Sequence, residues 1–103
     1  MPKQPESKLQ LNIRHRLEAA FPGSWWFKVH GGPFQKSGVP DHVGCVMGLF
    51  FAFEVKRPGE RASVIQEFTM ASIRRAGGVS CVVLTPEEAI AVVKRTLRLV
   101  QPT

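Results

Sequence analysis

The sequence lacks the features that mark membrane-bound or secreted proteins. No apolar run approaches the roughly 18 residues that cross a bilayer, and the first residues lack the apolar stretch of a signal peptide. Cysteine is scarce: Cys45 and Cys81 both lie in apolar segments, without a CxxC pair or a disulfide framework. We therefore expect a cytoplasmic protein with no membrane partner, in which both cysteines are reduced packing residues.

Acidic residues are also few. Fourteen Lys and Arg face eight Asp and Glu, so the net charge is +6 and the sequence pI is about 10.0. So basic a small chain favours a polyanionic partner, and nucleic acid fits better than an anionic membrane surface. The composition, 44% hydrophobic and 21% charged, is that of an ordered globular protein.

The chain also has no internal repeats, low-complexity tracts or linker-like stretches, which predicts a single domain over residues 1–103 with a loose arm at residues 1–5. A chain of 103 residues is at the small end for standing alone, so a dimer is an economical way to add buried surface.

Hydrophobic periodicity and turn signals predict three helices and four strands. The expected helices cover residues 6–21 and 63–76 and a last segment that starts at Pro86; the expected strands cover 25–30, 41–47, 49–57 and 79–84. The fold class is α/β: a β-hairpin followed by a strand-helix-strand crossover forms a small mixed sheet flanked by helices.

The most informative residues are Asp41 and, thirteen positions later, the run Glu54-Val55-Lys56. Side chains two apart on a strand point the same way, so Glu54 and Lys56 share one face of an otherwise apolar strand. A buried carboxylate needs a partner, and a divalent metal ion is one. A solvated edge strand with a cross-strand ion pair is the alternative for Glu54 and Lys56, and a turn cap after Pro40 is the alternative for Asp41.

Three short segments carry a family resemblance. Gly38-Val39-Pro40-Asp41, then Phe53-Glu54-Val55-Lys56, then Gln66 on the next helix resemble the PD-(D/E)XK nuclease superfamily, and within it the sequence is most similar to the compact stand-alone VRR-NUC branch. The resemblance covers about residues 6–85 and implies a restriction-endonuclease-like core. The element order expected from hydrophobic periodicity agrees with it.

The resemblance implies a role for each motif residue. Asp41, Glu54 and the Val55 backbone carbonyl would hold one or two Mg²⁺ or Mn²⁺ ions, and Lys56 would be the catalytic lysine. Hard oxygen ligands suit Mg²⁺, which keeps open positions for a phosphate oxygen and a water. Gln66 would orient Lys56 or a metal-bound water. Its alternative is purely structural, since Ser63 and Gln66 have the spacing of a helix capping box.

Family members often add an acid from the first helix, for which this chain offers Glu6 and Glu18. Glu6 continues the apolar stripe of the expected helix and is preferred as a metal ligand, whereas Glu18 lies about 100° around the helix from that stripe. The alternative is a capping box formed by Ser7 and Gln10, which would put Glu6 just outside the helix.

Basic and aromatic residues flank the motif. Four of the cations are expected to contact phosphates. Two histidines are expected at the polar rim of the site, and at least one of two tryptophans in the core. The cations are Lys28, Lys36, Arg57 and Arg61; the histidines are His30 and His42; the tryptophans are Trp25 and Trp26.

Together these features predict a metal-dependent DNA endonuclease without a small-molecule cofactor. No recognition module is left over after the core is assigned, so selectivity should follow DNA structure rather than base sequence. The VRR-NUC resemblance implies branched substrates such as Holliday junctions or flaps and a homodimer, with the final helix or an edge strand as interface candidates. The alternatives are a DNA-binding protein that does not cleave, and a restriction or mobile-element nuclease that reads sequence.

Overall fold

The computed structural model describes residues 6–30 and 37–100, which contain three helices and four strands. Their order along the chain is α1 (Glu6–Ala20), β1 (Trp25–Lys28), β2 (His42–Val46), β3 (Leu49–Val55), α2 (Val64–Arg75), β4 (Val79–Val83) and α3 (Pro86–Val100). This is the order that periodicity predicted, with β1, β2, β3 and α2 each two residues shorter than expected and α1 and β4 each one residue shorter. The arm expected at residues 1–5 lies outside the described residues.

The four strands form one mixed sheet in the order β1-β2-β3-β4. β1 pairs antiparallel with β2 and β2 antiparallel with β3, whereas β3 and β4 run parallel across the crossover that contains α2. Met47 and Gly48 form the two-residue turn of the β2–β3 hairpin, both with positive φ (53° and 81°), as a hairpin of this length favours. The expected hairpin and crossover are both confirmed.

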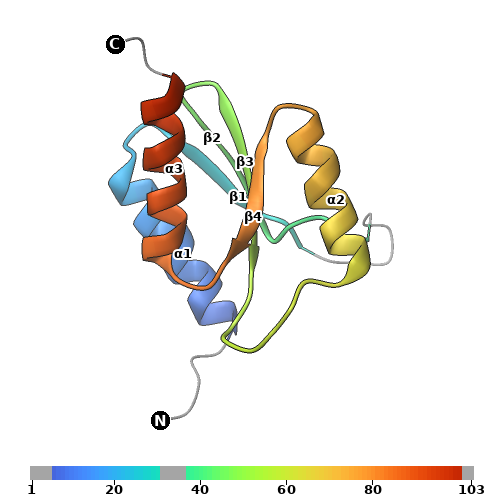
Figure 1. Cartoon of the computed structure of the whole chain (residues 1–103). Coiled ribbons are helices and arrows are strands. Elements are labelled where there is room, and N and C mark those ends of the chain that lie inside the picture. Colours follow the sequence, from blue (N-terminus) through green and yellow to red (C-terminus); the bar gives the residue numbers. More distant parts are fainter. Residues whose placement is uncertain (1–5, 31–36, 101–103) are drawn as a thin grey trace.

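The sheet separates two helical layers (Figure 1). α1 and α3 lie side by side on one face, and α2 lies on the other. The largest core residues lie between the sheet and the α1–α3 layer, where Ile13, Leu17, Phe51, Phe53 and Val55 are fully buried. The α2 face carries the alternate residues of the same strands.

Trp26 shows why β2 contains a glycine. The Trp26 ring packs against Phe51 and Phe53, and it lies directly over Gly44, where an added Cβ would come within 2.1 Å of the ring. Trp26 is therefore a core residue, as expected for at least one tryptophan, whereas its neighbour Trp25 points to the other face and is 60% exposed.

The expectation for the cysteines is half right. Cys81 is half-buried and packs against the core, but Cys45 is exposed, so its assignment as a packing residue was wrong. Alternation along β2 puts Cys45 on the face opposite Trp26, level with Trp25 and Phe50 and beyond the cover of α2. An apolar segment predicts a strand but does not say which of its faces a helix covers. None of the helices in the described ranges is long and apolar enough to span a bilayer.

Candidate metal-dependent active site

Glu54 and Lys56 leave the carboxyl end of β3 on the face that α2 covers. Phe53 precedes Glu54, and Val55 lies between Glu54 and Lys56. Both apolar side chains point into the α1–α3 layer and are fully buried. The expected division of β3 into a charged face and an apolar face is therefore present. Glu54 is nonetheless only 2% exposed, because α2 closes over its side of the strand.

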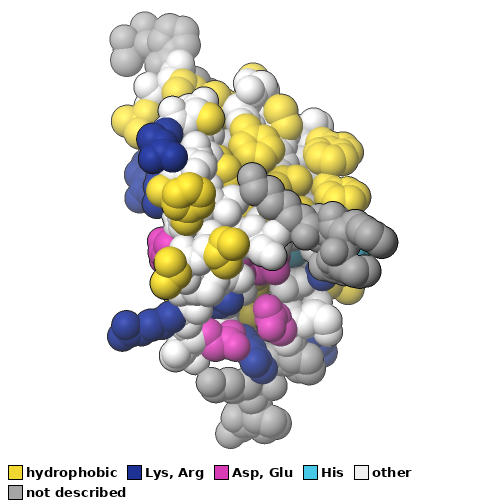
Figure 2. Space-filling view, turned by 90° about the vertical axis from the view of Figure 1, so that its right-hand side faces the viewer, with side chains coloured by type: hydrophobic (Ala, Val, Ile, Leu, Met, Phe, Trp, Pro, Cys, Tyr) yellow, Lys and Arg dark blue, Asp and Glu magenta, His cyan; other side chains and the backbone are white. Residues whose placement is uncertain are grey.

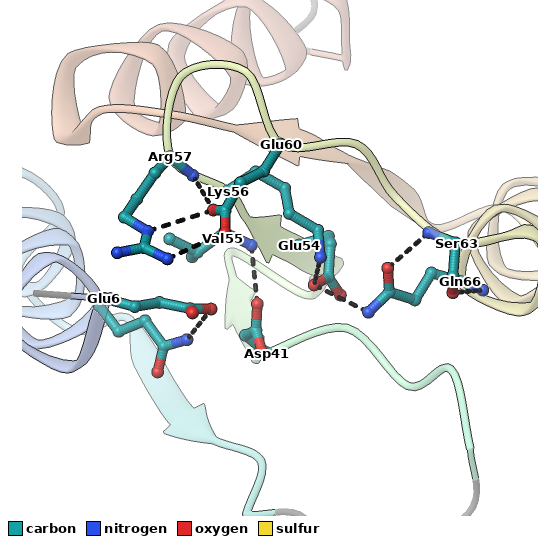
Figure 3. Close-up of polar contacts among 10 residues, drawn as sticks. Glu6, Asp41, Glu54, Val55, Lys56, Arg57, Glu60, Ser63 and Gln66 are labelled. Carbon is teal, nitrogen blue, oxygen red and sulfur yellow. Dashed lines mark hydrogen bonds and ion pairs between the residues drawn. The ribbon is translucent and has the colours of Figure 1, made fainter.

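Asp41 lies immediately before β2 and is held by both neighbouring strands. Its backbone carbonyl accepts a hydrogen bond from the Val29 amide at 2.8 Å, and its side-chain Oδ2 accepts one from the Val55 amide, also at 2.8 Å. The carboxylate is thereby fixed against the end of β3, beside Glu54 (Figure 3).

The Glu54 carboxylate has one satisfied and one unsatisfied oxygen. Oε2 forms an ion pair with Lys56 Nζ at 3.4 Å and accepts a hydrogen bond from Gln66 Nε2 at 3.2 Å. Oε1 is buried and has no hydrogen-bond partner among the described residues. Burial, and then the nearby Asp41 carboxylate, raise the pKa of Glu54 to about 8, against the opposing effect of the Lys56 ammonium. The site therefore favours a proton or another cation at this carboxylate.

Gln66 forms the expected capping box and also contacts Glu54, whereas its expected role toward Lys56 or a metal-bound water stays a prediction. Its Oε1 accepts from the Ser63 amide at 2.8 Å while the Ser63 hydroxyl accepts from the Gln66 amide at 3.2 Å, which completes a capping box at the start of α2. Its Nε2 remains free to donate to Glu54. The cap fixes the glutamine rotamer, and the fixed rotamer aims the amide at the carboxylate (Figure 3).

The donor set suits a hard divalent cation. Two carboxylates approach each other at the end of β3, and one of their oxygens, Glu54 Oε1, is buried and accepts no hydrogen bond within residues 6–30 and 37–100. A bound cation relieves this situation. In the described part of the chain, no cluster of three or more His, Cys, Asp and Glu side chains is arranged as a metal site. Asp41 and Glu54 would therefore need backbone or water oxygens to complete the coordination. Val55 contacts Asp41 through its amide, and ligation by its carbonyl stays a prediction.

Glu6 is the first-helix acid that reaches this region. It is the first residue of α1, accepts a hydrogen bond from Gln10 Nε2 at 3.3 Å, and its carboxylate points toward Asp41 and Arg57 (Figure 3). Glu18 is exposed and lies twelve residues further along α1, about 18 Å at the helical rise. The geometry therefore places Glu6, and not Glu18, near the paired carboxylates, and its role as a ligand stays a prediction.

Comparison with solved structures identifies the same architecture elsewhere. A structure described as a VRR_NUC domain superposes with a TM-score of 0.69 over 86% of this chain and 94% of its own, at 22% sequence identity. The chain has the VRR_NUC fold. Hjc from Archaeoglobus fulgidus, a Holliday junction resolvase from an archaeal hyperthermophile, superposes with a TM-score of 0.60 over 77% of this chain and 67% of its own, also at 22% identity. No family model and no curated protein matches the sequence.

The likeness confirms, at the level of fold, the resemblance to PD-(D/E)XK nucleases of the VRR-NUC branch. In this VRR_NUC fold, the motif residues meet where β2 begins, β3 ends and α2 has its first turn. Asp41, the Glu54–Lys56 pair and Gln66, which lie on three successive segments of the chain, are thereby brought together.

The expected phosphate-binding cations lie at different distances from the carboxylates. Arg57 follows Lys56 directly, whereas Arg61 is exposed further along the loop and Lys28 is half-buried at the end of β1. Lys36 lies outside the described residues. The contact with DNA phosphates stays a prediction for all four.

Sequence reasoning missed Glu60, which holds Arg57. The Arg57 amide donates to Glu60 Oε1 at 2.6 Å, and its guanidinium pairs with Glu60 Oε2 at 3.1 Å. These contacts lower the pKa of Glu60 to about 2. The spacing Arg57-x-x-Glu60 across Pro58-Gly59 was the signal that a turn would join the two side chains.

The expected rim position of His42 was wrong, whereas His30 is exposed. His42 is 1% exposed, and both its ring nitrogens lack hydrogen-bond partners among the described residues. Burial lowers the pKa of His42 to about 4; the Asp41 carboxylate opposes this, and the Lys28 and Arg14 cations add to it. The signal was the alternation of β2, which places His42 on the same buried face as Gly44.

Proposed function

We propose that this protein is a metal-dependent endonuclease that hydrolyses phosphodiester bonds in branched DNA. One observation carries the proposal: Glu54 is buried beside Asp41, with Oε2 held by Lys56 and Gln66, while Oε1 accepts no hydrogen bond from the residues that the structure describes. A protein that used this surface only to bind DNA would have no need for two adjacent, partly desolvated carboxylates, because they repel phosphate.

A divalent cation would be held by Asp41, Glu54 and the Val55 carbonyl, with Glu6 reaching it directly or through water. When bound, Mg²⁺ or Mn²⁺ lowers the pKa of a coordinated water and stabilises charge that develops on phosphoryl oxygens. The raised pKa of Glu54 means that cation binding releases a proton from this carboxyl near neutral pH, so the affinity for metal should rise with pH.

Lys56 and Gln66 have two other roles in the site: one neutralises charge on the phosphate, and the other positions the Glu54 carboxylate. The Lys56 ammonium, 3.4 Å from Glu54, lies where it can offset negative charge on a phosphate held at the carboxylates. Gln66 keeps the Glu54 carboxylate in place through a rotamer that the Ser63 cap already fixes. A preorganised set of this kind loses little entropy when substrate binds.

The expected substrate is DNA selected by its branched structure. The net charge of +6 favours a polyanion, and α3, the last described element, packs against α1 rather than standing free as a recognition helix. The superposition on the Holliday junction resolvase Hjc supports four-way junctions as the first substrate to test. We further propose that the enzyme acts in the cytoplasm as a homodimer, because resolving a two-fold symmetric junction takes two cuts.

The decisive assay presents end-labelled four-way junction, flap, nicked, single-stranded and duplex DNA to the protein in Mg²⁺, Mn²⁺ or EDTA. We expect cleavage of branched DNA with either metal and none in EDTA. Asp41→Ala and Lys56→Met should abolish cleavage, whereas Glu18→Ala, which removes an exposed α1 carboxylate away from the site, should leave it unchanged.

Two outcomes would favour other functions. Binding without cleavage in every metal would indicate a DNA-binding protein with a nuclease-like fold. Cleavage of plain duplex at one fixed sequence would indicate a nuclease that reads bases. Either result would overturn the structure-selective assignment.

A further inference from the structure

The two faces of the sheet are covered unequally. Strands lie about 4.8 Å apart and a helix with its side chains is about 10 Å wide, so a four-stranded sheet needs two helices on each face. α1 and α3 supply two on one face, whereas on the other face α2 is the one helix among the described residues, where it packs on β3 and β4 (Figure 1). The part of this face over β1 and β2, about as wide as one helix, carries no helix of the described ranges.

The uncovered part is apolar. Trp25 is 60%, Phe27 48% and Phe50 45% exposed, and the exposed Cys45 lies between Trp25 and Phe50 in the strand register. The Trp25 and Phe27 rings stack with centroids 5.9 Å apart and an interplanar angle of 4°. We call these four residues the bare half-sheet. Hydrophobic side chains gather in the upper part of the face shown in Figure 2, while the acidic side chains and most of the basic ones in view lie lower down.

α2 carries a second exposed apolar surface, one member of which, Ile65, also lies against Gly38. Phe68 is 67%, Ile65 49% and Val64 88% exposed on the side of α2 that points away from the sheet. Only Met70 of this helix is fully buried. We call these three residues the outer stripe of α2. A helix that is apolar on both sides is typical of one that packs between two surfaces.

We propose that the bare half-sheet of one copy binds the outer stripe of α2 from a second copy, and the reverse, in a two-fold dimer. The two surfaces are complementary: one is part of a sheet over which the described chain places no helix, and the other is the exposed apolar side of a helix. Such a reciprocal contact is what closed two-fold symmetry requires. The inference deepens the homodimer of the proposed function by naming its surface.

Charge points to a second copy rather than to DNA. Neither the bare half-sheet nor the outer stripe contains a charged residue, so neither attracts a phosphate backbone. Two chains of net charge +6 repel each other, and they approach most easily where both are uncharged. Depletion of charge and enrichment of aromatic residues also mark the centres of protein interfaces.

The exposed apolar area of the two surfaces is sufficient for a small dimer interface. At roughly 200 Å² for a whole aromatic side chain, the exposed fractions of Trp25, Phe27, Phe50 and Phe68 amount to about 450 Å² per copy. Ile65 and Val64 enlarge the surface, and two copies together approach the roughly 1,200 Å² of a small specific interface. The proposed contact is thus at the weaker end of stable dimers.

The test measures mass. In sedimentation velocity and light scattering we expect the wild type to run at twice the 11.4 kDa of the chain. Phe68→Asp on the outer stripe and, separately, Trp25→Asp on the bare half-sheet should each raise the dimer dissociation constant at least about 100-fold. Leu99→Asp, at a position that is 79% exposed on α3, is the matched control and should leave the mass unchanged.

Circular dichroism and the fluorescence of buried Trp26 show whether each variant is folded, and two independent variants keep the test valid if one is not. A wild type that is monomeric at about 100 μM, or folded variants that stay dimeric, would overturn the proposal. So would a Phe68→Asp protein of unchanged mass that loses DNA binding. Asp41→Ala should stay dimeric, so loss of cleavage and loss of assembly are distinguishable.

Discussion

Glu54 makes a testable contribution to stability that depends on pH. The pKa of this carboxyl rises from 4.5 to about 8 on folding, mainly through burial and then through Asp41. A group with a higher pKa in the folded state keeps its proton there while the unfolded chain loses it, so the free energy of unfolding falls as pH rises between the two values. The slope is about 1.4 kcal/mol per pH unit, and a side chain that is 2% exposed is little screened.

His42 changes the free energy of unfolding in the opposite direction over part of this pH range. Its pKa falls from 6.5 to about 4 on folding, so it makes the free energy of unfolding rise with pH until about 6.5. Above that pH only Glu54 titrates in this way, and the wild type should lose about 2 kcal/mol of stability by about pH 8. Glu54→Gln cannot ionise and should give a flat curve over this window.

Urea unfolding followed by tryptophan fluorescence, in EDTA and at one protein concentration, measures both curves. Glu67→Gln, which removes an exposed carboxylate from the first turn of α2, should follow the wild type. If the wild-type and Glu54→Gln curves run parallel between about pH 6.5 and pH 8, Glu54 is not a buried, proton-binding carboxyl, and the argument that it attracts a metal ion loses its basis.

Three further predictions follow from single contacts. Gly44→Ala forces a Cβ into the Trp26 ring and should lower the free energy of unfolding by about 3 kcal/mol in urea titrations. Gly48→Ala, at a position with open space but a positive φ, should lower the free energy of unfolding by only about 1 kcal/mol. If Gly44→Ala and Gly48→Ala lowered it equally, the close packing of Trp26 on Gly44 would not be what requires a glycine there. Gln66→Ala should cost about 1 kcal/mol through the α2 cap and lower the cleavage rate about 10- to 100-fold, whereas unchanged cleavage would leave Gln66 a cap alone. Arg57→Ala should reduce the slope of log affinity against log salt by about 1 in binding titrations, and an unchanged slope would mean that Arg57 stays with Glu60 when DNA binds.

Local patterns predicted the elements well because their signals are short-range. Thr85-Pro86 marked the start of α3, Ser63 and Gln66 marked the start of α2, and alternation separated Glu54 from the apolar face of β3. Periodicity and capping depend on residues within a few positions of each other. The element order, the hairpin and the crossover were therefore readable from the chain itself.

Contacts between elements were less accessible to sequence reasoning. His42 was expected at the rim and is buried, because whether the end of β2 is covered depends on where α1 packs. Cys45 was expected in the core and is exposed, because α2 covers only half of its face. An alternating strand has two faces, and the helical layers decide which of them meets solvent.

Local sequence was enough to predict which side chains share a face and which helix ends are capped, because both follow from backbone geometry over a few residues. Three features of the site depend on how the elements pack: Asp41 accepts from the Val55 amide, Gln66 reaches Glu54 from its cap, and one buried Glu54 oxygen meets no donor among the described residues. Those contacts join segments 12 to 14 residues apart. Their distances are set by the pairing of β2 with β3 and by the docking of α2, which no local pattern specifies.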